Sequence, residues 1–282
     1  MDSLILIKNR INSIHSTRQI TQSMRTVSTV KVQRARERML AGRPFLEQAR
    51  RLVQAAGAAL PYGEHPLLAP REGIRAAVLV VSGDRGLCGG YNLNVCKALS
   101  ALAKSHADLK IIIVGSKAAD YCAQRFQGKV TRSYTGISEN PFYEDAEAIA
   151  AALMGWYKNA EVDQVYIIYT QFRTMLSQRT TTAKLLPLEI DPPGGATTRF
   201  EIPSTEIFTH AVPFYVTAFV YAAILESAAC EHSARIATMD SAVKNAGGMI
   251  EALTLLYHQA RQGEITREII EIVSGADAAE ES

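Results

Sequence analysis

Apolar residues near the N-terminus recur at alternating steps of three and four, which is the spacing of a coiled-coil seam. The first positions of this seam are Leu4, Ile7, Ile11 and Ile14. A slip interrupts the seam before Ile20, and a second apolar series runs from Leu46 to Leu60. Gly42 and Pro44 precede that second series, and an interior proline removes a backbone hydrogen bond and clashes with the preceding turn. The pattern predicts an N-terminal coiled-coil helix over residues 1–60 and leaves its continuity through Gly42 and Pro44 open.

The C-terminal part of the chain carries a more regular form of the same pattern. Steps of four and three connect Ala242, Ala246, Met249, Leu253, Leu256 and Ala260. After one slip, the steps resume at Ile265, Ile269, Ile272 and Ala276. No proline follows Pro213, so the region predicts one helix over residues 205–278. Separate, shorter helices of an all-α domain remain the alternative interpretation of the two terminal patterns.

Helices of this length cannot bury an apolar stripe within a compact domain, so each needs a partner of matching length. Residues 1–60 carry eleven basic and three acidic residues, whereas residues 210–282 carry four basic and ten acidic ones. The net charges of +8 and −6 that follow attract each other. If both helices leave the same central domain, the pair they form is antiparallel.

The middle of the chain alternates between short apolar runs and helical patterns, which favours a parallel or mostly parallel sheet in an α/β domain over residues 74–190. The apolar runs, rich in β-branched residues, are 76–81, 111–114 and 165–169. The helical stretches are 93–106, 117–127 and 143–159. Residues 180–188 are typical of an edge strand, and residues 191–198 predict a loop that leads to the last helix.

A glycine-rich loop, Gly83–Asn92, follows the first apolar run. Free amides at such a strand-to-helix turn can hold a phosphate. The glycine spacing, however, matches neither the dinucleotide-binding nor the P-loop pattern, and Asp84 would repel a phosphate. The sequence therefore favours a tight structural turn or a partner contact over nucleotide binding.

Composition is that of an ordinary soluble protein, with 48% hydrophobic and 21% charged residues among 282. No run approaches the ~18 consecutive apolar residues of a membrane span, and the first ten residues lack a secretory signal, so we infer an intracellular chain. The four cysteines form no paired motif, and no catalytic residue, metal site or cofactor is expected. The basic run 31–51 lacks interleaved aromatic residues, which argues against nucleic-acid binding.

Three segments together resemble the gamma subunit of F-type ATP synthases. They are Ile11–Met24, Gly83–Asn92 and Ala234–Ala276, in the order in which the family carries them. The resemblance implies an antiparallel coiled coil of the two terminal helices beside a Rossmann-like α/β domain. It also implies a non-catalytic rotor of the central stalk, which couples proton-driven rotation of a c-ring to ATP synthesis or hydrolysis in the beta subunits.

The resemblance further implies partners and contact positions. Expected partners are the ring of alpha and beta subunits, the epsilon subunit, the c-ring, and delta and other subunits through the complex. Nucleic acid is not expected, and membrane association is indirect, on the cytoplasmic face of a bacterial inner membrane. By match to the family motif, the expected contacts with the alpha/beta ring are Met24, Arg261, Gln262, Thr266 and Glu268. Lys31, Arg34 and Arg36 are expected to join them because their positive charge and position suit acidic loops of the beta subunit. Expected contacts with epsilon or the c-ring are Asp84, Arg85, Cys88 and Glu201.

A competing interpretation is a free-standing coiled-coil adaptor or scaffold with an α/β head. It predicts a soluble protein that is stable on its own, whereas a rotor subunit is expected to copurify with a membrane ATPase.

Overall fold

The computed structural model describes residues 2–60, 65–71, 73–106, 108–138, 140–175, 177–190 and 203–280. For residues 2, 3 and 275–280 it describes the backbone alone. These residues form two compact units: residues 1–27 with 236–282, and residues 28–235. Two long helices contribute residues to both units: α1 (Asp2–Ala58) and α5 (Ser204–Glu280). The predicted loop 191–198 and Glu201 lie outside the described residues.

The helix α1 is continuous through Gly42 and Pro44, the point that the apolar pattern left open. Pro44 and Leu40, the residue four positions before it, are both exposed to solvent. Water can therefore bind the Leu40 carbonyl group that loses its usual intrahelical partner. Met39 and Ala49 on either side are buried and hold the flanking turns in place.

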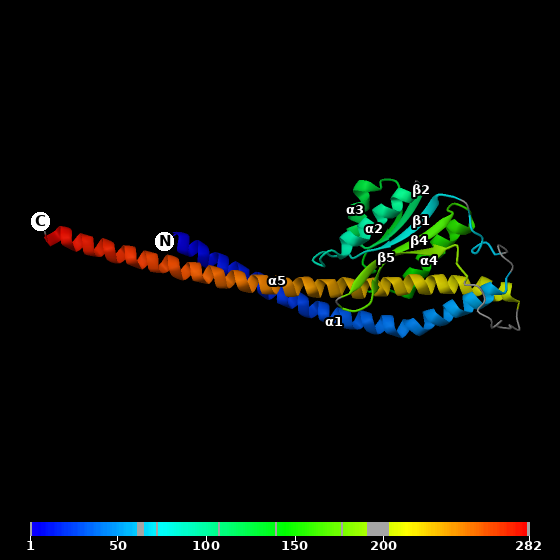
Figure 1. The fold of residues 1–282 in the computed structure, drawn as a ribbon, viewed down its shortest axis with the longest axis horizontal. Coiled ribbons are helices and arrows are strands. Elements are labelled where there is room, and N and C mark those ends of the chain that lie inside the picture. The colour runs from blue at the N-terminus through cyan, green and yellow to red at the C-terminus, as the bar shows by residue number, and fades with distance from the viewer. Residues whose placement is uncertain are drawn as a thin grey trace. The chain divides into compact units, whose positions relative to one another are not determined.

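In the first unit the two terminal helices run in opposite directions (Figure 1). A salt bridge of 2.5 Å joins Arg25 Nε of α1 to Asp240 Oδ1 of α5. The pairing expected from the opposite charges of the two ends, and the antiparallel direction expected of helices that leave one central domain, are thereby confirmed for this unit.

The second unit is built on a five-stranded sheet of order β3-β2-β1-β4-β5. The strands are β1 (Arg75–Val81), β2 (Asp108–Val114), β3 (Val130–Tyr134), β4 (Gln164–Phe172) and β5 (Gln178–Leu186). The first four are mutually parallel, and β5 pairs antiparallel with β4 at the edge. The helices between them are α2 (Tyr91–Ser105), α3 (Ser116–Arg125) and α4 (Tyr143–Lys158).

Every strand expected from an apolar run is present, but the sequence pattern missed β3. The ends of β3, Val130 and Tyr134, are half-buried and its three middle residues are exposed. An edge strand with so little burial lacks the continuous apolar run that marked the central strands.

Helices cover both faces of the sheet (Figure 1). Alternate residues of β1 point to opposite sides. Ala76, Val78 and Val80 pack with α2 and α3. Ala77, Leu79 and Val81 pack with α4 and with parts of α1 and α5. Because both faces are buried, the central strands carry continuous apolar runs, such as Ala76–Val81 of β1 and Ile111–Val114 of β2.

By length and composition alone, one helix among the described residues could cross a membrane. An 18-residue window within Ser204–Ser274 of α5 reaches a mean hydropathy of 1.6, and 44% of that window is buried in the protein. Its apolar side chains within residues 204–235 form part of the core against the sheet, from Phe208 to Ile224.

Candidate functional site

The loop after β1 is held by its own acidic residue, Asp84. Asp84 Oδ1 accepts a hydrogen bond from the backbone N–H of Ser116 at 3.0 Å. Asp84 Oδ2 accepts from the backbone N–H of Gly136 at 3.0 Å and from Ser138 Oγ at 2.6 Å. One carboxylate therefore connects the loops that follow β1, β2 and β3.

This arrangement explains why a glycine-rich loop of this kind need not bind phosphate. Ser116 is the first residue of α3, so its N–H belongs to the helix terminus that would attract an anion. Asp84 already supplies a negative charge to that N–H. The glycine-rich loop is thus a structural turn whose anion comes from within the chain.

Cys88, an expected epsilon or c-ring contact, is buried in this loop and only 2% exposed. Asn92 Nδ2 donates a hydrogen bond to its Sγ at 3.2 Å. Burial raises the pKa of the Cys88 thiol, which keeps it protonated and unreactive. Arg85 and Leu87 beside it are exposed, and Leu87 has a positive φ of 60°. The loop therefore exposes Arg85 and Leu87 at the surface and buries Cys88.

The other cysteines are also buried free thiols. Burial raises the pKa of Cys122 to about 12 and raises the pKa of Cys96 and Cys230 as well. Among the residues with a described placement, no group of three or more His, Cys, Asp or Glu side chains could hold a metal ion.

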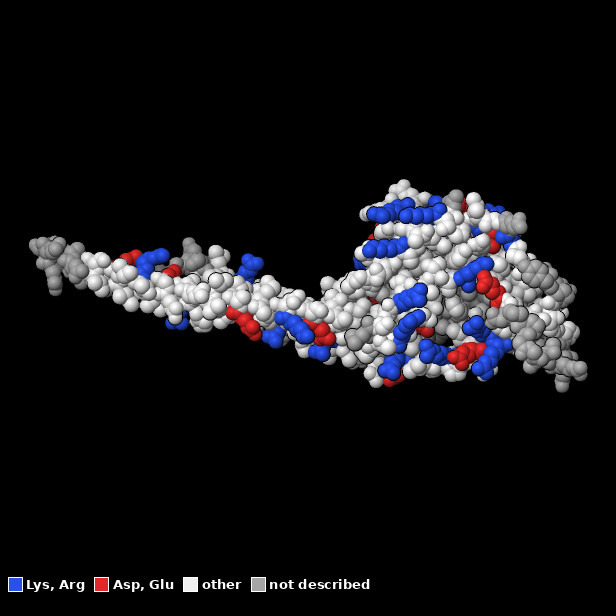
Figure 2. Space-filling view, viewed as in Figure 1, with Lys and Arg blue, Asp and Glu red and all other residues white. Residues whose placement is uncertain are grey.

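The expected alpha/beta-ring contacts lie on the two long helices. In the first unit, Met24 is half-buried, while Arg261, Gln262, Thr266 and Glu268 are exposed. Thr266 Oγ1 donates to the backbone carbonyl of Gln262 at 2.9 Å, so these two residues share one face of α5. Basic and acidic side chains are interspersed along these helices on the face shown in Figure 2.

The basic candidates Lys31, Arg34 and Arg36 belong to the second unit. Arg34 and Arg36 are exposed, and Lys31 is half-buried. Arg38, which follows them on α1, donates from Nη1 to Asn140 Oδ1 at 3.0 Å. The contacts of all these residues with partner subunits stay predictions.

Sequence reasoning missed a buried charged cluster on α5. Glu231, His232 and Arg235 are only 2%, 3% and 6% exposed. Arg235 Nη2 lies 2.6 Å from Glu231 Oε1, and Arg235 Nη1 lies 3.0 Å from His232 Nδ1. The spacing of four between Glu231 and Arg235 was a readable signal of an ion pair on a helix, but nothing in the sequence showed that the pair is buried.

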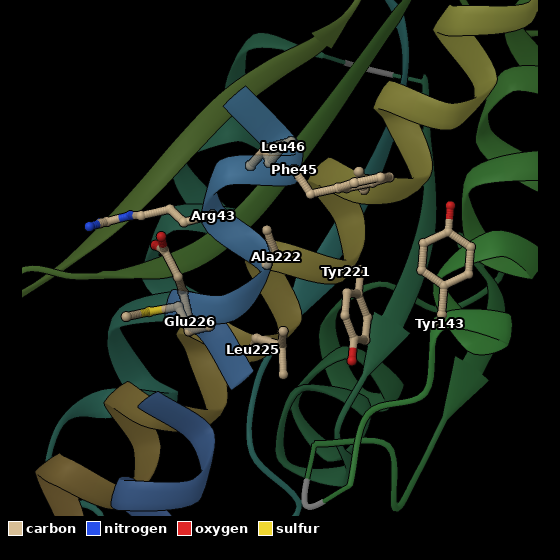
Figure 3. A pocket seen from close by; sticks show the side chains of 11 residues that line it. Arg43, Phe45, Leu46, Tyr143, Tyr221, Ala222, Leu225 and Glu226 are labelled. Atoms are coloured by element: carbon tan, nitrogen blue, oxygen red, sulfur yellow. The ribbon is translucent and has the colours of Figure 1, made fainter. Parts of the chain in front are cut away.

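A pocket of about 230 Å³ opens between α1, α4 and α5 in the second unit. Figure 3 shows the rings of Phe45, Tyr143 and Tyr221 around it, with the Arg43 guanidinium directed away from them. Glu226 also lines it. Burial raises the pKa of Glu226, against the opposing effects of a backbone hydrogen bond from Phe172 and of the Arg43 charge. The lining is mostly apolar and aromatic, and its charged groups are the Glu226 carboxylate and the Arg43 guanidinium.

Comparison with known proteins identifies the family. A family model described as ATP synthase matches residues 3–279. The ATP synthase gamma chain of Anaeromyxobacter sp. (strain Fw109-5) is 42% identical over 289 residues, with 99% of each chain covered. The chain belongs to the ATP synthase gamma chain family.

A second relative and two solved structures are also similar to this chain. The ATP synthase gamma chain of Pelotomaculum thermopropionicum is 40% identical over 285 residues, covering 99% of this chain and 100% of that one. In the rotor of Euglena gracilis mitochondrial ATP synthase, a chain with 18% identity superposes with a TM-score of 0.69, covering 94% of this chain and 99% of that chain. A chain from the central stalk and c-ring of Tetrahymena thermophila mitochondrial ATP synthase, with 21% identity, gives 0.63, covering 79% of this chain and 99% of that chain.

The family resemblance read from three sequence segments is therefore confirmed, and so is the fold class of an α/β domain with long antiparallel helices. At these low identities the solved structures bear on the fold alone. They agree with it over both the sheet and the helices, because 94% of this chain is covered in the Euglena gracilis match.

Proposed function

We propose that this chain is the non-catalytic rotor of the central stalk in an F-type ATP synthase. In this role it couples proton-driven rotation of the c-ring to the synthesis or hydrolysis of ATP in the beta subunits. The observation that carries the proposal is the 42% identity to an ATP synthase gamma chain along 99% of both chains. Matching over the whole length leaves the helices and the α/β domain in the same order as in the relative.

The exposed apolar side chains of α5 support a rotor that turns inside a ring of other subunits. Ile269, Ile272 and Val273 are 56%, 71% and 53% exposed. Soluble proteins rarely leave neighbouring apolar residues uncovered, since this surface favours contact with a partner. A smooth apolar sleeve formed by the alpha and beta subunits would cover these side chains and would let them slide, because hydrophobic contact is non-directional.

The proposal places nucleotide chemistry in the beta subunits. In support, the amide at the start of α3 that could attract a phosphate is bound to Asp84 of this chain. The chain then transmits rotation without catalysing a reaction, and each of its predicted domains has a separate role. Residues 1–60 and 205–278 form the shaft, and residues 74–190 form the head near the c-ring.

The same proposal assigns the partners. The alpha and beta subunits surround the shaft, epsilon and the c-ring contact the α/β domain, and delta is linked through the complex. The chain is then a peripheral protein on the cytoplasmic face of a bacterial inner membrane, held there by the c-ring. The relatives from Anaeromyxobacter and Pelotomaculum, which are bacteria, support this location.

Purification of the affinity-tagged chain from its own host, in mild detergent, tests the proposal. Native mass spectrometry is expected to find the chain in a complex with alpha and beta subunits that hydrolyses ATP. Recovery of a stable free chain, without those subunits, would instead support the adaptor with an α/β head.

The contact residues are tested separately by Gln262→Leu. Gln262 is exposed on α5. In the proposal its amide contacts one beta subunit after another as the shaft turns. The substitution is expected to lower proton pumping and ATP hydrolysis in the assembled enzyme. Gln259→Leu is a matched control, because Gln259 is exposed on the same helix and is not among the proposed contacts. Equal activity of the two variants would remove Gln262 from the interface.

A further inference from the structure

One stretch of α5 is bound to the carboxyl ends of two neighbouring strands within the second unit. Ser227 Oγ accepts the backbone N–H of Thr170 in β4 at 3.1 Å, and the Cys230 thiol donates to the Thr170 carbonyl at 3.4 Å. Farther along the helix, the Arg235 guanidinium donates to the carbonyl of Gly86, in the loop after β1, at 3.2 and 3.4 Å. The helix therefore contacts both β4 and the loop that follows β1.

The carboxyl ends of β1 and β4 mark the point where the sheet reverses its winding. The helix after β1 covers one face of the sheet, and the helix before β4 covers the other. Open α/β sheets bind their ligands in the crevice at such a point. In this chain the buried side chains of Glu231 and Arg235 lie where such a ligand would bind. The loop lies against them, since a Cβ added at Gly83 would be 2.6 Å from the carboxyl carbon of Glu231.

The chemistry of this contact suits a mechanical role better than a stabilising one. Glu231 and Arg235 are paired at 2.6 Å and are almost fully buried. A buried ion pair adds little net stability, because the loss of hydration offsets the attraction. Its charge-assisted hydrogen bonds are directional, however, and add a fixed orientation to the non-directional apolar packing of α5 on the sheet. The pair therefore fixes the register of the helix against the loop.

We propose that Glu231 and Arg235 form a torque joint, which locks the loop after β1 to α5 so that the α/β domain and the helix turn together. This inference rests on the proposed function, in which the c-ring drives the α/β domain and α5 acts on the beta subunits. The joint thus occupies the crevice in which related α/β sheets bind a ligand, and it fills that crevice with an ion pair of the chain itself. Arg235 acts as a positioning residue, since its guanidinium holds the loop through the Gly86 carbonyl.

The experiment uses the complete ATP synthase, reconstituted in liposomes, with Arg235→Lys in this chain. Lysine keeps the charge but cannot hold the Glu231 carboxylate and the Gly86 carbonyl with one planar group. We expect hydrolysis of ATP with an added uncoupler to stay at the wild-type rate, and the proton gradient reached per ATP hydrolysed to fall. Arg179→Lys is the control, because Arg179 is exposed on β5, and it is expected to change neither quantity.

A second variant separates the joint from simple loss of folding. Glu231→Leu with Arg235→Met removes both charges and leaves no unpaired one, so the fold is kept, while the hydrogen bonds to Gly86 are lost. In the full-length chain, hydrogen exchange of amides 83–90 is expected to rise about tenfold or more in both variants, since the loop loses charge-assisted hydrogen bonds.

Two outcomes would overturn the torque joint. One is faster exchange in residues 83–90 with an unchanged gradient per ATP, because the loop would then be loose without mechanical effect. The other is a fall of uncoupled hydrolysis and pumping in equal proportion, which indicates a general structural role. Failure of the proposed function looks different, because the wild-type chain would then be recovered without alpha and beta subunits.

Discussion

Replacing Asp84 by asparagine is expected to loosen the three loops that its carboxylate connects. In the wild-type chain the carboxylate accepts hydrogen bonds from Ser116 N–H, Gly136 N–H and Ser138 Oγ at 3.0, 3.0 and 2.6 Å. An asparagine side chain has nearly the same shape but only one accepting oxygen. Its amide nitrogen must therefore face at least one of these donors, and any remaining hydrogen bond loses its charge.

The magnitude follows from the number and type of bonds. Hydrogen bonds to a charged group contribute about 1.5–3 kcal/mol each, and an unsatisfied buried donor costs about 1–3 kcal/mol. We expect Asp84→Asn to lower the free energy of unfolding of the second unit by about 2–4 kcal/mol. The loss should be local to the carboxyl ends of β1, β2 and β3, because the apolar clusters on both sheet faces are unchanged.

Urea unfolding of the full-length chain, followed by tryptophan fluorescence, measures this loss. The chain has one tryptophan, Trp156, which lies on α4 and packs against the sheet cluster, so the signal reports the second unit. Asp120→Asn is the matched control. Asp120 pairs at 3.2 Å with Lys117 on the surface of α3 and is 69% exposed, so the expected change is within about 0.5 kcal/mol. A loss for Asp84→Asn no larger than for this control would refute the structural role of Asp84.

Three further results are expected. Gly115→Ala should lower stability by at least about 2 kcal/mol, because Gly115 has a φ of 98° and an added Cβ would lie 2.3 Å from a backbone carbonyl oxygen. In a denaturant titration Gly128→Ala should cost less, since Gly128 has a φ of 75° but nothing within 4 Å of the added Cβ. The hydrogen bond and charge of Arg75 hold the pKa of Asp163 below its usual value. The stabilisation from this pair is thus complete above the unfolded-state pKa of about 3.9 and is lost as the pH falls through the lower folded-state pKa. Unfolding curves of wild type and Asp163→Asn, recorded from pH 7 to pH 2, should therefore converge in acid, and a constant difference would contradict this assignment. Ala222→Leu should raise the thermal midpoint, because the added carbons enter the 230 Å³ pocket and each buried methylene contributes about 0.8 kcal/mol; a lower midpoint would mean that the pocket cannot accept them.

The long helices and the central strands were predictable because each has a simple local pattern of apolar residues. Apolar steps of three and four identified both terminal helices, and continuous apolar runs identified β1, β2 and β4, which are buried on both faces. The strand β3 was missed because its middle residues are exposed. Pro44 was a real ambiguity, since its effect depends on whether water or protein surrounds the carbonyl group that it leaves without a partner.

Some residues of the candidate site could likewise be selected from the sequence, whereas the role of others needed the structure. Exposed residues such as Gln262 and Arg34 could be selected from the sequence, because a solvent-facing position on a long helix follows from periodicity and from the family resemblance. For Asp84 the sequence supplied only a carboxylate among glycines, which favoured a tight structural turn or a partner contact over phosphate binding. The structure adds that its oxygens are bound to residues 32, 52 and 54 positions away in the chain.

The sequence by itself determined the long helices, the central strands and the attraction between the two ends of the chain, since the pattern of apolar residues and the sum of charges need no knowledge of distant neighbours. Only the tertiary structure decided what the charged residues of α5 do. Glu231 and Arg235 look like an ordinary surface pair at a spacing of four, and their burial against Gly83 and Gly86 depends on how the helix packs on the sheet. Burial changes the energetics of a charge far more than its position in the sequence does. The physical role of these residues could therefore be recognised only from the folded chain.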